Sequence, residues 1–240
     1  MSPQPGQPAP PAPRPAPRLA PRLALFSGLG IRHDLYARQR HLDGVRVEMV
    51  PWLAVERGET LQSYARRLAA TIDPSGPLYL GGVSFGAMLA IEAASSLRPR
   101  GVFNIAGARS GRAVSPLVKL TCGVAPRLSD SMIRATLGGA GLLIRMTGRP
   151  DRAERKHLLH LADTAIPWLI RWSCSAMLDW EAPRELDCPI HHIHGDLDHL
   201  IPFANVRKDV DEIVPGGGHI INVTHADVVN RFILERLSLR

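Results

Sequence analysis

The stretch that most constrains the fold of this chain is residues 77–91, which read PLYLGGVSFGAMLAI. Residues 78–80 predict a short apolar strand, and the Ala-rich residues after the Gly-x-Ser-x-Gly motif predict a helix. In such a strand-turn-helix the serine has a strained backbone, and its hydroxyl is exposed at the end of the strand. Side chains at Gly82 and Gly86 would collide with the neighbouring strand and helix. The motif predicts that Ser84 is a nucleophile at a helix N-terminus that favours negative charge; the alternative is a Gly-rich turn with a surface serine.

Apolar strands alternate with helices along the rest of the chain, which is typical of an α/β fold with a mainly parallel sheet and helices on both faces. Six strands are expected, at residues 23–26, 45–50, 78–80, 102–105, 189–194 and 211–214. Helices are expected at 34–41 with Asp34 as cap, from Thr60, after Ser84, after Pro202 and at about 226–237. Because right-handed crossovers place the carboxyl ends of the strands at one edge, the loops that follow them should meet there.

The chain divides into three regions by composition. Residues 1–21 are rich in Pro, Ala and Arg and are expected to be disordered or polyproline II. Residues 22–105 and 184–240 carry the α/β pattern and form the expected core. Residues 106–183 show helical periodicity without a clear strand and predict a helical cap. Six of the cap's apolar residues lie near one helical face: Leu158, Leu161, Ala165, Trp168, Leu169 and Trp172.

Composition bounds the partners and the compartment. The net charge of +7 comes almost entirely from scattered arginines, without a basic stripe and stacking aromatics, so no nucleic acid is expected as partner. No run reaches the roughly 20 apolar residues of a membrane span. Three cysteines without Cys-x-x-Cys spacing indicate neither a disulfide framework nor a zinc site. Because residues 1–21 also lack the apolar segment of a secretory signal, a reducing cytoplasmic location is expected.

A nucleophilic serine needs a base, and histidine suits that role because its pKa lies near neutrality. Of the ten histidines, His219 is best placed, in a Gly-rich loop after the last strand. A carboxylate must orient the imidazole. No acid follows the strand at 102–105, so the candidates are Asp196 and Asp198 in the loop after the strand at 189–194.

Acyl-transfer chemistry at Ser84 would require two donors for an oxyanion. The backbone N–H of Phe85 is one candidate, because it follows the serine. The other is the N–H of Leu29 in the loop at residues 27–30, which reads SGLG. An ordinary Gly turn is the alternative for that loop.

One motif points to a different chemistry. Residues 192–196 read HIHGD, which resembles the start of the His-x-His-x-Asp-His zinc motif of metallo-β-lactamase-like hydrolases. The next residue there should be histidine, and here it is Leu197. The motif also lies late in an α/β pattern. No metal is therefore expected, and His192 and His194 are interpreted as residues of a buried strand near the sheet edge.

Together these residues resemble the α/β-hydrolase superfamily over residues 23–240. The spacing of Gly195, Asp198 and Pro202 resembles the family's acid loop, which selects Asp198 over Asp196, and Gly218-His219 resembles its histidine loop. The resemblance is greatest to small bacterial members that begin Ser-Gly-Leu-Gly and carry a helical cap. Two departures are the absence of the first two antiparallel strands and Ala87 where many relatives have glycine. Neither removes a catalytic group.

The resemblance implies a serine hydrolase that acts on an ester or thioester, with Ser84 as nucleophile, His219 as base and Asp198 as acid. It implies no metal or organic cofactor. The cap should cover the site, and Trp168, Trp172 and Met177 are expected to line a substrate pocket, with packing of the cap on the core as the alternative for each. Acyl transfer to another acceptor, C–C bond cleavage and ligand binding without turnover are open alternatives. The substrate and the oligomeric state do not follow from the sequence.

Overall fold

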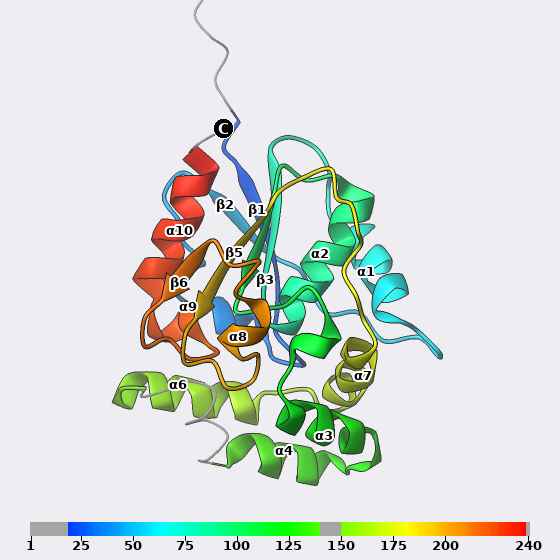
Figure 1. The fold of residues 1–240 in the computed structure, drawn as a ribbon. Coiled ribbons are helices and arrows are strands. Elements are labelled where there is room, and N and C mark those ends of the chain that lie inside the picture. Colours follow the sequence, from blue (N-terminus) through cyan, green and yellow to red (C-terminus); the bar gives the residue numbers. More distant parts are fainter. Residues whose placement is uncertain (1–18, 140–149, 239–240) are drawn as a thin grey trace, which may run out of the picture.

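The computed structural model describes residues 19–139 and 150–238, and its centre is a six-stranded sheet (Figure 1). All paired strands are parallel, in the order β2-β1-β3-β4-β5-β6. The prediction of an α/β fold with a parallel six-stranded sheet is confirmed, whereas the predicted tail lies mostly outside the described residues. The strands are β1 (Arg22–Phe26), β2 (Arg46–Met49), β3 (Leu78–Val83), β4 (Val102–Ile105), β5 (Ile190–Gly195) and β6 (Glu212–Val214).

Apolar side chains alternate between the two faces of the sheet, and each face is covered by helices. In β1, Ala24 and Phe26 pack in one buried cluster, and Leu23 and Leu25 pack in the other. Helices α1 (Leu61–Ala69) and α2 (Phe85–Leu97) lie on one side of the sheet, and α9 (Ile221–Thr224) and α10 (Ala226–Ser238) lie on the other (Figure 1). Burial on both faces explains why the central strands are apolar runs rather than alternating ones.

The helices of the insertion between β4 and β5 gather beyond the carboxyl edge of the sheet (Figure 1). Ser115, Ser129 and Asp151 precede three of them, and each side chain accepts a hydrogen bond from the first turn, which explains where these helices begin. The described helices of this region are α3 (Pro116–Val124), the 3₁₀ turn η3 (Ala125–Arg127), α4 (Asp130–Gly138), α6 (Arg152–Asp163) and α7 (Pro167–Leu178). Shorter elements elsewhere are η1 (His33–Tyr36), η2 (Gly111–Ala113) and α8 (Phe203–Val206).

Two helix predictions were wrong in detail. The apolar face predicted over residues 158–172 is divided between α6 and α7, because Pro167 begins a new helix and Ile166 before it is extended at φ −103° and ψ 99°. The helix predicted from Asp34 is a single 3₁₀ turn, with Arg32 at its N-cap position and Asp34 within the turn.

Among the residues that the structure describes, no helix is both long and apolar enough to pass through a membrane.

Candidate active site

Ser84 stands at the junction of β3 and α2 in a backbone conformation that non-glycine residues rarely adopt. Its φ is 57° and its ψ is −121°. A Cβ added at Gly82 would collide with the backbone of Gly86, and one added at Gly86 would collide with the carbonyl of Phe26. The tight approach of α2 to β1 and β3 therefore requires both glycines, as the motif predicted. The turn presents Ser84 beyond the carboxyl end of the sheet.

A buried tyrosine supports this turn from beneath. The hydroxyl of Tyr36 donates to the carbonyl of Phe26 at 2.5 Å and accepts from the N–H of Val83 at 2.9 Å. Burial raises the pKa of Tyr36 well above its ordinary value, so the phenol stays neutral and keeps its proton for Phe26. Tyr36 thus ties the end of β1 to the residue just before Ser84.

A carboxylate and an imidazole form a buried pair in the loops after β5 and β6. The Nδ1 of His219 lies 2.7 Å from Oδ2 of Asp198, and both residues are almost fully buried. The other carboxylate oxygen accepts the backbone N–H groups of Leu200 and Ile201 at 2.8 and 2.9 Å. These bonds hold the carboxylate in one orientation.

The charge state of Asp198 follows from its partners. Burial alone would raise the pKa of the carboxyl, but the charge of His219 and hydrogen bonds from His194 and His219 outweigh it and hold the pKa well below its usual range. Asp198 is therefore ionised at neutral pH. Asp196, the other acid considered from the sequence, instead accepts the N–H of Gly216 at 2.7 Å in the turn after β6.

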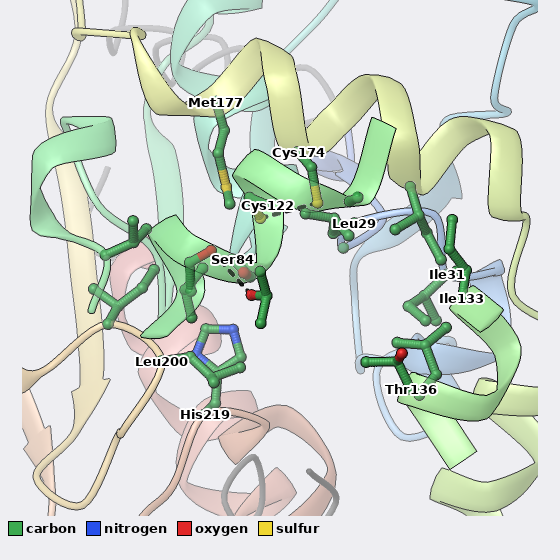
Figure 2. A pocket seen from close by; sticks show the side chains of 18 of the residues that line it. Leu29, Ile31, Ser84, Cys122, Ile133, Thr136, Cys174, Met177, Leu200 and His219 are labelled. Atoms are coloured by element: carbon green, nitrogen blue, oxygen red, sulfur yellow. Dashed lines mark hydrogen bonds between the residues drawn. The ribbon is translucent and has the colours of Figure 1, made fainter. Parts of the chain in front are cut away.

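Ser84 and His219 line the same pocket, which has a volume of about 400 Å³ (Figure 2). Asp198 occupies Nδ1 of the imidazole, so Nε2 is the nitrogen left for the pocket. Within the described residues the Ser84 hydroxyl makes no hydrogen bond to His219; such contacts are often long before a substrate binds. The other lining residues are mainly aliphatic. Many come from the loop after β1 and from α3, α4 and α7, and others come from η1, β3, α2 and the loops after β5 and β6.

Several solved structures of known proteins resemble this chain over about nine-tenths of its length. An esterase from Exiguobacterium antarcticum matches at a TM-score of 0.74 and 12% identity, over 90% of this chain and 91% of that one. The enol-lactonase of Burkholderia xenovorans LB400 matches at 0.72 and 19% identity, over 91% and 92%. A bromoperoxidase from Bacillus anthracis matches at 0.69 and 18% identity, over 91% of each. This chain has the α/β-hydrolase fold.

Sequence comparison reaches less far than structure comparison. No family model matches the chain. One curated protein, from Synechocystis sp., carries a provisional name as a non-heme chloroperoxidase and is 40% identical over 66 residues. That match covers 24% of this chain and spans only 24% of the relative's length, about a quarter of each.

In this α/β-hydrolase fold, the loop after β1 brings Leu29 into the pocket beside Ser84. Within the described residues the N–H of Leu29 has no hydrogen-bond partner. Phe85 begins α2, so its N–H is one of those that a helix leaves without an intrahelical partner. Gly30 has a positive φ of 62°, and a Cβ there would collide with Ile170 of α7. The missing side chain at Gly30 thus lets this loop approach α7 closely.

The predicted pocket residues of α7 divide into two groups. Met177 lines the pocket, but Trp168 and Trp172 do not, which corrects the expectation for both. Trp168 is exposed on another side of α7. The ring of Trp172 packs on Tyr64 and Phe85, and its Nε1 donates to the carbonyl of Glu59 at 2.9 Å. Trp172 thus fastens the insertion to α1 and α2, in agreement with the packing alternative.

The two histidines of β5 were missed as parts of this site. His194 Nε2 lies 3.2 Å from Oδ2 of Asp198, and its Nδ1 lies 3.2 Å from Nε2 of His192. The signal for this contact was the spacing itself, since residues 192 and 194 share one face of a strand that ends just before the acid loop. Within the described part of the chain no group of three or more His, Cys, Asp and Glu has the arrangement of a metal site.

Proposed function

We propose that this protein is a serine hydrolase of carboxylic esters or thioesters, with a triad of Ser84, His219 and Asp198. The observation that carries the proposal is the buried 2.7 Å contact between Asp198 and His219 in the same pocket as a serine held at φ 57°. A strained serine that lines a pocket and an oriented imidazole are the two parts that nucleophilic catalysis at a carbonyl needs.

The proposed reaction has two halves. In the first, Ser84 Oγ attacks the carbonyl carbon while Nε2 of His219 takes its proton, and the N–H groups of Leu29 and Phe85 hold the oxyanion. The tetrahedral intermediate collapses to an acyl-enzyme, and His219 returns the proton to the leaving alcohol or thiol. In the second half, water gives a proton to Nε2 of His219 and attacks the acyl carbon. The bond to Ser84 Oγ then breaks, and His219 returns the proton to Ser84 Oγ as the acid is released. Asp198 remains ionised throughout and stabilises the imidazolium.

Several further features support this proposal. Relatives of the same fold include esterases and a lactonase, which act on ester carbonyls by the names they carry. The insertion, residues 106–183, is proposed as a cap that covers Ser84 and selects the substrate. Cys122 and Cys174 form no disulfide, which fits the cytoplasm as the proposed location.

A fluorophosphonate probe tests the proposal directly. The wild type should be labelled and should hydrolyse p-nitrophenyl acetate, and Ser84→Ala should show neither property while keeping the melting temperature of the wild type. Ser110→Ala, which removes a hydroxyl outside the pocket, is the matched control and should react like the wild type. A folded wild type that is not labelled would leave a ligand-binding protein as the better reading. Product analysis with added alcohols would separate hydrolysis from acyl transfer.

A further inference from the structure

The pocket next to Ser84 offers almost no hydrogen bond to a ligand beyond the triad. Apart from His219, none of the described residues that line it is charged or aromatic. Its two threonines are already engaged within their own helices: Thr121 Oγ1 donates to carbonyls of α3 at 3.0 Å, and Thr136 Oγ1 donates to Met132 at 2.8 Å. The two thiols of the wall, Cys122 and Cys174, contact each other at 2.9 Å. A charged or hydroxylated group bound here would lose its hydration without replacement.

The pocket also has a direction. Ser84, His219 and Leu200 lie together, and Ile31, Ile133 and Thr136 lie together some way from them, with Met177 above Ser84 and Cys174 above the path between the two groups (Figure 2). A carbonyl attacked by Ser84 would therefore send its acyl group toward α4. Because a water molecule's share of liquid volume is ~30 Å³, a volume of 400 Å³ holds about a dozen non-hydrogen atoms.

We propose that this pocket binds an unbranched, uncharged aliphatic acyl chain of medium length, and that Ile133 and Thr136 of α4 set its upper limit. This inference rests on the proposed function, since it names the acyl group of the same reaction. Aliphatic walls without spare donors stabilise a chain by area removed from water, so each methylene that fits should raise kcat/KM by up to about fourfold. At the α4 end Thr136 is exposed to solvent, so carbons that extend past it remove little further area from water, and kcat/KM should stop rising.

A chain-length series with p-nitrophenyl esters from acetate to dodecanoate tests this proposal. We expect kcat/KM to rise with length to a maximum among the medium chains. Thr136→Trp should lower the ratio of kcat/KM for octanoate to that for acetate at least tenfold, because the indole fills the far end. Ala135→Trp adds the same ring on the exposed neighbouring residue of α4, outside the pocket, and should keep the wild-type ratio.

The outcomes separate this proposal from the proposed function. A wild type that hydrolyses acetate and octanoate equally well, or a Thr136→Trp variant with an unchanged ratio, would overturn the acyl pocket and leave the serine hydrolase standing. A wild type that hydrolyses no ester and takes no fluorophosphonate would overturn the proposed function itself.

A second inference rests on a different observation, the chain of buried groups behind the acid. His194 Nε2 lies 2.9 Å from the carbonyl of Ile201 and 3.2 Å from Oδ2 of Asp198, and both His194 and Asp198 are buried. Both partners are acceptors, so Nε2 must carry the proton and donate. Oδ2 of Asp198 therefore faces the N–H groups of His194 and His219, and its other oxygen takes two backbone donors.

The geometry points to His194 as a positioning residue, which holds Asp198 ionised and oriented toward His219. Without this donor the carboxylate of Asp198 would be more basic, and it would attract the imidazolium of His219 more strongly. Both effects would move the acidic limb of the kcat/KM profile to higher pH. The titratable and charged groups that face this cluster are His192, His219 and, from the loop after β4, Arg109, which faces His192.

Two replacements at His194 distinguish positioning from packing. His194→Phe keeps the ring without a donor and should shift the acidic limb upward while it lowers kcat. His194→Gln keeps an N–H near the position of Nε2 and should return the limb toward the wild-type pH. If both variants lose kcat with an unshifted limb, His194 only fills space and the inference is overturned. If His194→Phe does not fold, a His194→Gln variant whose limb is shifted well above that of the wild type overturns it equally.

Discussion

The two sides of the candidate site are built in opposite ways. On the core side, both carboxylate oxygens of Asp198 and Nδ1 of His219 are held by specific partners, and the backbone at Ser84 is constrained by two glycines that the packing requires. On the side of α3, α4 and α7, the pocket wall is aliphatic, its hydroxyls donate to carbonyls of their own helices, and its two thiols contact each other. A site of this kind separates the chemistry, which depends on single atoms, from selectivity, which depends on shape and area. Substitutions should therefore have large, specific effects on the core side and graded effects on the other.

The largest effect is expected for the triad. Ser84→Ala and His219→Ala should each lower kcat by about 10³-fold or more, and the double variant should lose little beyond either one, because the two residues act as a unit. Met177→Ala on the opposite wall should change the preferred chain length and alter kcat less than tenfold. Steady-state rates on one ester give the kcat of all four proteins, and the series of p-nitrophenyl esters gives the chain-length preference of Met177→Ala. Losses that multiply in the double variant would show that Ser84 and His219 act independently.

A smaller but still large effect is expected on stability when the Gly-x-Ser-x-Gly turn at residues 82–86, the elbow, is changed. Gly86→Ala places a Cβ against the carbonyls of Phe26 and Ser27, which are backbone atoms and cannot move aside as side chains do. We expect a loss on the order of 3 kcal/mol in the free energy of unfolding. Urea titration measures it, and an Ala variant as stable as the wild type would mean that α2 can move away from β1.

The success of the sequence predictions follows the same division. The six parallel strands were predictable because burial on both faces imposes apolar runs. The elbow was predictable because steric crowding of the backbone requires a glycine at both ends of a five-residue motif. The positions of Trp168 and Trp172 were not predictable in this way. Their face was assigned from a periodicity that assumed one helix, whereas Pro167 starts α7 afresh and sets its own rotation.

The acid loop shows a second limit of sequence reasoning. Chain order and spacing predicted Asp198 and His219. Asp198 lies in the loop after β5, and His219 lies in the loop after the neighbouring strand β6. The contact of His194 with Asp198 depends on how the chain turns back between residues 195 and 198, and this turn brings a buried strand residue against the loop that follows it. Histidine spacing alone fits a metal site, a buried strand or a hydrogen-bonded support, and only the position of the acid decides among them.

Lowering the pH should reduce the free energy of unfolding through the buried titratable groups of the core side, because the described part of the aliphatic wall has no group that titrates in this range. Burial, with the nearby charges of His194 and Arg109, lowers the pKa of His192 to about 3 from an ordinary value of 6.5. Below pH 6.5 the unfolded chain therefore takes up a proton at this residue that the folded chain does not. The contribution of neutral His192 to the free energy of unfolding is fully present above pH 6.5 and is lost as the pH falls toward 3. Asp198, whose pKa is lowered, adds a further loss as the pH falls below the ordinary range of aspartate.

The check is the free energy of unfolding by urea at pH 7.5, 5.5 and 4.5. His192→Gln should reduce the loss between the first two pH values, because the titrating imidazole is gone. His41→Gln is the matched control, since that side chain is exposed, and should leave the loss as in the wild type. An equal pH dependence in all three proteins would show that His192 does not carry it.

The smallest effect, and the clearest contrast with Gly86, is expected at Gly123 in the last turn of α3. A Cβ at this position meets no atom within 4 Å, and its φ is not positive. Gly123→Ala should therefore stabilise the protein by ~0.5 kcal/mol through helix propensity and lower entropy of the unfolded chain, which is a rise of about 1–2 °C in melting temperature. The ester preference should stay as in the wild type, because residue 123 does not line the pocket. The same exchange thus has opposite signs on the two sides of the site, because backbone atoms surround one glycine and open space surrounds the other. A loss of stability at both positions would show that α3 is packed as tightly as the elbow. The expected contrast between large effects on the core side and graded effects on the side of α3, α4 and α7 would then be wrong.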